Sequence, residues 1–196
     1  MNTDFIKNKL KDCLSEERFL HTLGTAQCAR ELAKKYGLDE DKAYLTGLLH
    51  DCAKCLETQE LLKIIKEELK DVDEGELQNY KTFHAPVGAY FAKKIYGIND
   101  NEILGAIRKH TIGTTGMSLF EKIIFLADKI EPNTRDKKYR DEIWEILNKN
   151  EGEDGVNLAL FRCFCETIKS LVNRELKICK TTIDVYNELL DKVKNI

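Results

Sequence analysis

Apolar residues recur at intervals of three and four along most of this chain, which is the spacing of amphipathic helices. In the first such segment, residues 3–14, one face carries Phe5, Ile6 and Leu10. The last residues, 181–196, begin with β-branched side chains, yet their later valine and leucine spacing is also helical. We find no alternating apolar and polar stretch long enough to indicate a strand. The pattern therefore predicts an all-α fold, a bundle of helices.

Capping residues and helix breakers divide this pattern into elements. Ser15 and Asp39 suit the start of a helix, and Gly37 suits the end of one. The predicted helices after the first cover residues 16–36, 39–55, 58–69, 84–96, 101–110, 118–130, 140–150, 156–180 or beyond, and 181–196. The acidic segment 71–76 is predicted to form a surface loop, and Gly113 and Gly116 mark another loop.

Composition narrows the class of protein. The 196 residues are 42% hydrophobic and 33% charged, which suits one globular core, and we expect a single domain over residues 1–196. The net charge of -3 argues against nucleic acid as a partner, because proteins that bind phosphate backbones are usually basic. No apolar run approaches the roughly 20 residues that cross a bilayer, so no membrane partner is expected.

The seven cysteines bear on the cellular compartment. Their odd number and the polar first ten residues favour free thiols in a reducing cytoplasm. Cys52 and Cys55 form a CxxC, and Cys163 and Cys165 form a second close pair. A zinc ribbon needs two CxxC knuckles in loops, and a thioredoxin-like site needs a βαβ context, so helix packing is the preferred interpretation.

Histidine and aspartate supply the candidate chemistry. The chain has only four histidines, and His50-Asp51 directly follows the apolar pair Leu48-Leu49. Burial of an unpaired imidazole or carboxylate is costly, and metal coordination would satisfy both. Asp128 poses the same problem, because the residues around it, 125–130, are mostly apolar. Taken singly, each of these residues also has an ordinary structural interpretation, such as a helix end or a solvated face.

The order of these residues carries more information than any one of them. The series His21, His50-Asp51, His84, His110 and Asp128 resembles the HD superfamily of metal-dependent phosphohydrolases. Segments 83–89 (FHAPVGA), 107–113 (IRKHTIG) and 127–135 (ADKIEPNTR) are similar to its branch of symmetrical diadenosine tetraphosphate hydrolases. The likeness covers about residues 15–180. Residues 136–139 (DKKY) depart from it, because Phe-Pro-Gly or a similar sequence is expected there.

The resemblance implies an HD-domain bundle with two divalent cations. It assigns His21, His50, Asp51 and Asp128 to one ion, and His84, His110 and a bridging Asp51 to the second. It implies ferrous iron, whereas nitrogen and oxygen ligands also suit manganese or zinc. A metal-activated hydroxide would attack the polyphosphate bridge and release two ADP. The same likeness places Asp51 and Lys54 in catalysis.

The resemblance and the local sequence also suggest which residues meet the substrate. The predicted substrate-binding residues are Lys54, Thr111, Gly113, Glu131 and Arg135. Lys54 and Arg135 would meet phosphate charge, Gly113 would let the backbone approach closely, and Glu131 would contact substrate or cap a helix. The expected partner is a small nucleotide of the dinucleoside polyphosphate class. The oligomeric state stays open, with a homodimer as one option.

Two alternatives are kept beside this interpretation. One is another HD-type phosphohydrolase with a single metal, a 5'-nucleotidase or a cyclic-nucleotide phosphodiesterase, which would not need His84 and His110. The other is a non-catalytic sensor of nucleotide or metal that kept the pocket. Activity across nucleotides and alanine substitution of the two histidines distinguish the three.

Overall fold

The computed structural model describes residues 3–72 and 74–194, and its elements are helical throughout. Their order is α1 (Thr3–Cys13), α2 (Glu16–Lys35), α3 (Glu40–Leu49), α4 (Thr58–Glu68), α5 (Glu74–Leu77), the 3₁₀ turn η1 (Tyr80–Thr82), α6 (His84–Lys94), α7 (Asn101–Lys109), α8 (Leu119–Ile130), α9 (Lys137–Lys149), α10 (Gly152–Asn173) and α11 (Lys180–Val193). No strand occurs within these residues. The prediction of an all-α fold is therefore confirmed.

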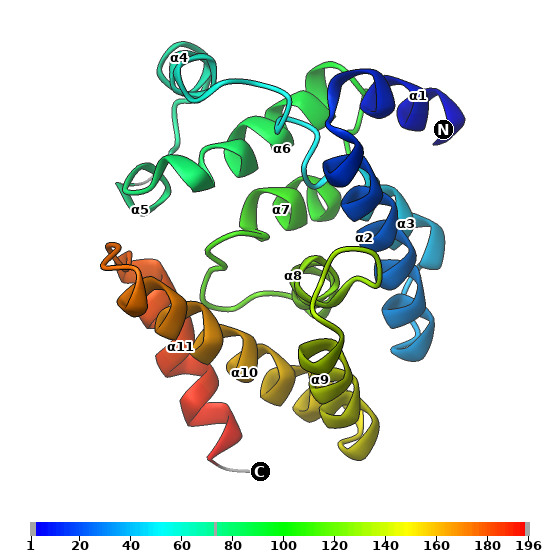
Figure 1. Ribbon diagram of the computed structural model, residues 1–196, viewed down its shortest axis with the longest axis vertical. Coiled ribbons are helices and arrows are strands. Elements are labelled where there is room, and N and C mark those ends of the chain that lie inside the picture. Colours follow the sequence, from blue (N-terminus) through cyan, green and yellow to red (C-terminus); the bar gives the residue numbers. More distant parts are fainter. Residues whose placement is uncertain (1–2, 73, 195–196) are drawn as a thin grey trace.

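Helix α8 is the central element of the bundle. It lies in the middle of the molecule, and α2, α7, α9 and α10 pack around it (Figure 1). Every residue from Phe120 to Asp128 is buried. The polar Lys122 is tolerated there because its Nζ donates to Glu153 Oε1 at 2.6 Å and to Asn157 Oδ1 at 2.7 Å. Asp128, near the end of the same helix, therefore also requires polar partners.

Helices α2 and α3 approach each other closely enough to bring His21 and His50 together. At Gly47 an added Cβ atom would lie 2.6 Å from Ala26 Cα and 2.9 Å from Ala26 N. A side chain at this position would force the two backbones apart, because real Cβ atoms do not come that close. Gly47 therefore sets the spacing between the helix that carries His21 and the helix that ends before His50.

Most helix ends lie where the capping residues predict. Ser15 and Asp39 cap α2 and α3 by accepting hydrogen bonds from Arg18 N and Lys42 N, and Gly37 has a φ of 67°. Helix α9 begins three residues earlier than expected because Asp136 Oδ1 accepts from Tyr139 N at 2.9 Å. This start falls within residues 136–139, where the chain departs from the family pattern.

Three further elements differ from prediction. The third helix ends at Leu49, and residues 50–55 form turns instead of continuing the helix to Cys55. The helix expected over 156–180 ends at Asn173, where Glu175 takes a φ of 53° and Leu176 N donates to Leu171 O at 2.9 Å. Part of the predicted acidic loop 71–76 is the short helix α5, while Asp73 lies outside the described residues.

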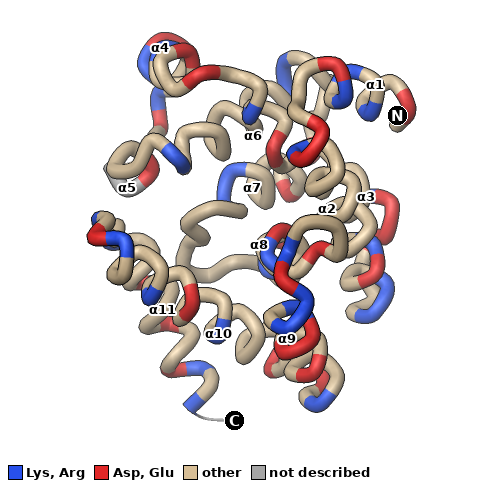
Figure 2. Tube along the Cα trace, in the orientation of Figure 1, with Lys and Arg blue, Asp and Glu red and all other residues tan. Residues whose placement is uncertain are grey.

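The outer faces of the bundle carry both signs of charge. Figure 2 shows Lys, Arg, Asp and Glu interspersed along outer helices such as α4 and α9. None of the helices that the structure describes combines the length and apolarity that a membrane crossing requires.

Candidate metal centre

Side chains from α2, α8 and the end of α3 form a first donor group, which consists of His21, His50, Asp51 and Asp128. Donor atoms of the first three lie within 4.8 Å of one another. Asp128 Oδ1 completes the group, since it lies 3.1 Å from His21 Nε2 and 3.8 Å from His50 Nε2. All four side chains are buried. Residues 107 positions apart in the sequence thus share one small volume, as the sequence predicted.

A second donor group, which consists of Asp51, His84 and His110, adjoins the first. Asp51 Oδ1 lies 3.1 Å from His84 Nε2 and 3.5 Å from His110 Nε2. The other oxygen, Oδ2, faces the first group, at 3.5 Å from His50 Nε2 and 3.8 Å from His21 Nε2. Asp51 therefore directs one oxygen to each group, which is the geometry that a bridging ligand needs.

The orientation of the imidazoles fits cation binding. His50 Nδ1 lies 2.7 Å from Gly47 O, and His110 Nδ1 lies 2.6 Å from Ile107 O. Since a carbonyl only accepts, each Nδ1 carries the proton and each Nε2 presents a lone pair to the donor groups. His84 Nε2 and His110 Nε2 then face each other at 3.1 Å. A proton shared between these two nitrogens, or a cation in its place, satisfies this contact, so the residues fit a metal centre.

The pKa shifts of His50, His84 and the two aspartates match the protonation states that metal ligands require, whereas at His21 burial is outweighed by Asp128 and Glu131, which raise the pKa. Burial lowers the pKa of His50 to about 3 and that of His84 to about 4, so both rings are neutral near pH 7. Burial alone would raise the pKa of Asp51, yet His50, His110 and His84 together hold it well below its usual value. Lys129 and His21 outweigh burial at Asp128 in the same way. Neutral imidazoles and ionised carboxylates are the forms that bind divalent cations.

Three of the donor histidines lie at helix ends. His50 and His110 each follow the last residue of a helix, α3 and α7, and each Nδ1 bonds the carbonyl three residues back. His84 is the first residue of α6. Backbone carbonyls in a last helical turn lack partners within the helix, so the two imidazoles satisfy them and become fixed in orientation.

Glu131 supports His21 from behind and does not line the cavity. It is fully buried, and its Oε1 lies 3.1 Å from His21 Nδ1. The carboxylate also accepts from Asn133 N at 2.6 Å and from Thr134 N at 3.0 Å. The His21 contact, the Thr134 hydroxyl and Asn133 N outweigh burial and lower the pKa of Glu131 to about 2. Glu131 was predicted to contact substrate or cap a helix; its position makes it a positioning residue for His21.

Gly24 is a residue of the site that the sequence analysis missed. A Cβ atom at Gly24 would lie 2.2 Å from Glu131 Oε2, so only glycine leaves room for this carboxylate behind His21. Gly24 lies three residues after His21 on α2, and therefore on the same helix face. A glycine at that spacing inside a long helix is the signal that could have revealed it.

Substitution of Glu131 by Gln tests this supporting role. We expect the metal affinity to fall about 10-fold to 100-fold, because the neutral amide no longer raises the basicity of His21. Equilibrium titration of the metal-free protein with a divalent cation measures the effect. The exposed Glu145→Gln on α9 serves as the matched control. An unchanged affinity in the Glu131 variant, with an unchanged unfolding temperature, would contradict the assignment.

A cavity of about 550 Å³ opens over the two donor groups. Among the predicted substrate-binding residues, Lys54, Thr111 and Arg135 line it. Burial lowers the pKa of Lys54. Gly113 lies outside the cavity: with a φ of 71°, a Cβ there would meet Phe164 Cζ at 2.9 Å in the core. Gly113 thus shapes the turn after α7 and does not offer its backbone to a ligand in the cavity.

Two basic residues that contact the carboxylates of the donor groups were not anticipated. Arg18 Nη1 lies 2.9 Å from Asp51 Oδ2, and Lys129 Nζ lies 2.8 Å from Asp128 Oδ2. The predicted Arg135 adds a contact of 2.8 Å between its Nη2 and Asp128 Oδ1. Arg18 lies one helical turn before His21, and this spacing is the signal that the sequence offered. The cavity therefore surrounds its buried carboxylates with cations.

The cysteine pairs take no part in either donor group. Cys52 is buried and its Sγ donates to Gly88 O at 3.4 Å, while burial raises the pKa of this thiol. Cys163 is also buried and receives a hydrogen bond from the Tyr139 hydroxyl at 3.0 Å. Within the described residues, no group of metal-binding side chains includes a cysteine. These contacts agree with the interpretation as packing residues for Cys52 and Cys163, whereas Cys55 is exposed.

The all-helical bundle and its paired His/Asp groups define a class, the helical metal-dependent hydrolases whose site centres on a His-Asp pair. Residues 18–133 match the HD domain family. The chain belongs to this HD family.

Within this family, the chain is similar to several relatives and to one solved structure. The chain is 37% identical to the symmetrical bis(5'-nucleosyl)-tetraphosphatase of Halalkalibacterium halodurans, over 97% of this chain and 98% of the relative. It is 36% identical to the protein of the same name from Bacillus subtilis, with the same two coverages. A crystal structure from Clostridium acetobutylicum, described as a predicted HD superfamily hydrolase involved in NAD metabolism, is 35% identical. Its TM-score is 0.89, with 98% of each chain covered.

Proposed function

We propose that this protein hydrolyses diadenosine tetraphosphate symmetrically and releases two ADP. The observation that carries this proposal is the split of Asp51, whose two oxygens face two separate donor groups at the floor of a basic cavity. Similarity over nearly the full length to two proteins named symmetrical bis(5'-nucleosyl)-tetraphosphatases supplies the substrate. The same similarity does not favour a mononucleotidase, a cyclic-nucleotide phosphodiesterase or a non-catalytic sensor.

The proposal includes two divalent cations, with iron as the preferred metal and manganese or zinc as alternatives. The first donor group would hold one cation and the second would hold the other, with Asp51 shared between them. Bound cations at such a site lower the pKa of water to near neutrality and stabilise charge on phosphoryl oxygens. The buried, hydrogen-bonded imidazoles keep the ligand positions fixed, so little reorganisation accompanies binding.

The basic residues of the cavity would bind the polyphosphate. Lys54, Arg18 and Arg135 line the same cavity as the donor groups, and the two arginines contact its carboxylates. Once cations neutralise Asp51 and Asp128, the two guanidinium groups become available for phosphate oxygens, which they match in a bidentate geometry. Thr111, on the wall beside His110, would add a hydroxyl to this set.

Product analysis tests the reaction directly. The protein is loaded with ferrous iron under anaerobic conditions, incubated with diadenosine tetraphosphate, and the products are separated by anion-exchange chromatography. We expect ADP as the sole nucleotide product, because attack of water on one central phosphorus atom that breaks its bond to the oxygen bridging the two central phosphates leaves two phosphates on each adenosine. ATP together with AMP would contradict symmetrical cleavage, and the absence of cleavage would favour the sensor. A cytoplasmic location and a homodimer stay predictions.

A further inference from the structure

One face of α10 forms a long wall of the cavity. The α10 residues that line the cavity, with the capping Arg174, recur every three or four positions: Cys163, Glu166, Thr167, Ser170, Leu171 and Arg174. At 1.5 Å per residue, this stripe extends about 16 Å along the helix. We call it the α10 stripe. The cavity is therefore an extended groove, and its length goes beyond what the two donor groups need.

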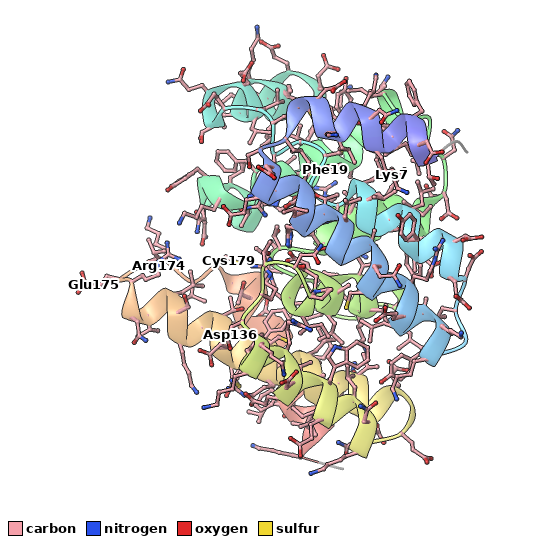
Figure 3. The ribbon with its side chains drawn as sticks, turned by 45° about the vertical axis from the view of Figure 1, so that its right-hand side comes forward. Lys7, Phe19, Asp136, Arg174, Glu175 and Cys179 are labelled. Carbon is pink, nitrogen blue, oxygen red and sulfur yellow. The ribbon has the colours of Figure 1, made fainter. Side chains whose placement is uncertain are left out.

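The two ends of the α10 stripe lie in different surroundings. At the inner end the Tyr139 hydroxyl donates to Cys163 Sγ at 3.0 Å, and the cavity residues Asp128 and Lys129 are close enough to influence the pKa of that thiol. At the outer end Arg174 lies where α10 turns toward α11 (Figure 3). Lys81 of η1 also lines the groove. The groove therefore leads from the metal centre to the end of α10.

The basic residues at the inner and outer ends of the groove differ in whether they form ion pairs. Arg18, Lys129 and Arg135 each contact a carboxylate of the metal centre. In the part of the chain that the structure describes, neither Lys81 nor Arg174 forms an ion pair, and both side chains are exposed. Two cations that line one groove without carboxylate partners favour an anionic ligand.

We propose that the α10 stripe, with Lys81 and Arg174, binds one of the two nucleoside diphosphate halves of the substrate. This inference rests on the proposed function, because a symmetrical dinucleotide cleaved at its centre must extend beyond the metal centre on both sides. Lys81 and Arg174 attract its charge, and the Arg174 guanidinium also offers a planar surface for a base. The hydroxyls of Thr167 and Ser170 suit a ribose, and Leu171 offers apolar contact. The groove thereby gives a preference for dinucleotides.

The double variant Lys81→Gln/Arg174→Gln tests the groove, with Lys169→Gln as the matched control on an exposed position of α10 outside the cavity. We expect the KM for diadenosine tetraphosphate to rise about tenfold, the equivalent of about 1.4 kcal/mol, with kcat within twofold. The second measurement is calorimetric binding of the analogue that has a methylene group between its central phosphorus atoms, which does not depend on turnover. Its Kd should rise by a similar factor.

A second variant tests the groove by filling its space instead of removing its charge. Ser170→Phe places a large ring in the middle of the α10 stripe and should weaken the analogue at least as much, while metal content stays unchanged. An unchanged KM and Kd in the double variant would overturn the proposal, as would an equal effect of Lys169→Gln. A loss of kcat with an unchanged KM would also overturn it, because it would place these residues in the metal chemistry. If the wild type binds the analogue but cleaves no diadenosine tetraphosphate, the proposed function fails while the groove is still tested.

Discussion

Replacement of Asp51 by Asn is expected to lower kcat for diadenosine tetraphosphate about a thousandfold or more, a loss of about 4 kcal/mol in transition-state stabilisation. The two carboxylate oxygens of Asp51 face different donor groups, at 3.1 Å from His84 Nε2 and 3.5 Å from His50 Nε2. Asn keeps the shape of the side chain, yet its NH₂ group is not a metal ligand and its charge is zero. The substitution therefore removes one ligand and weakens the other in a site that is otherwise rich in neutral imidazole.

Metal content and kinetics together check this prediction. Emission spectroscopy of the purified variant should detect fewer cations per chain than in the wild type, and the far-ultraviolet circular dichroism should be unchanged. Asp141→Asn, an exposed carboxylate of α9 that pairs with Lys137, is the matched control and should keep full activity. A variant at position 51 with full metal content and normal kcat would remove Asp51 from the centre of the mechanism.

Helix positions followed from local sequence because their causes are local. The caps at Ser15 and Asp39 need only a side-chain oxygen and an amide two or three residues away, so the sequence contains the whole interaction. The end of α10 is different. Glu175 adopts a left-handed conformation that usually calls for glycine, and the helical pattern continues past it toward Cys179. Nothing in the local sequence marks that break.

For the site, the sequence likewise predicts what depends on local residues and does not predict what depends on the packing of distant helices. The six donor residues were predicted from their order, and the structure brings all six together. Their arrangement was not accessible from the sequence, because it depends on the separation of helices that are far apart along the chain. The close approach at Gly47 and the space at Gly24 set that separation. This is why Glu131, expected to contact substrate or cap a helix, lies behind His21, and why Arg18 and Lys129 were missed.

Charge balance gives the basic residues around the buried carboxylates a second role. Asp51 and Asp128 are nearly inaccessible, and a buried carboxylate without a partner is strongly destabilising. Arg18, Lys129 and Arg135 approach them from the cavity side, where a polyphosphate would also enter. The same cations therefore stabilise the folded protein without ligand and are positioned for phosphate when metal ions take over the carboxylates.

Substitution of His84 or His110 by Ala is expected to lower kcat about 100-fold to 1,000-fold in each case, because each would remove a ligand of the proposed second cation. An enzyme with one cation, held by His21, His50, Asp51 and Asp128, would tolerate either change. Titration of metal into the variants should show one cation bound with near wild-type affinity and the second bound weakly. This stoichiometry separates the two-metal mechanism from the one-metal alternative, independently of the rate.

The folded state needs its own control, because both histidines are buried. Tyr90→Phe on α6 removes only a surface hydrogen bond of 3.0 Å to Glu68, and should leave kcat unchanged. In the metal-free protein the contact of 3.1 Å between His84 Nε2 and His110 Nε2 contributes one hydrogen bond at most, whereas in the metal-loaded protein each ring would also hold a cation. We therefore expect a much smaller shift in the unfolding temperature of the metal-free variants than of the metal-loaded ones. Wild-type activity in either histidine variant would show that the second donor group does not serve the reaction.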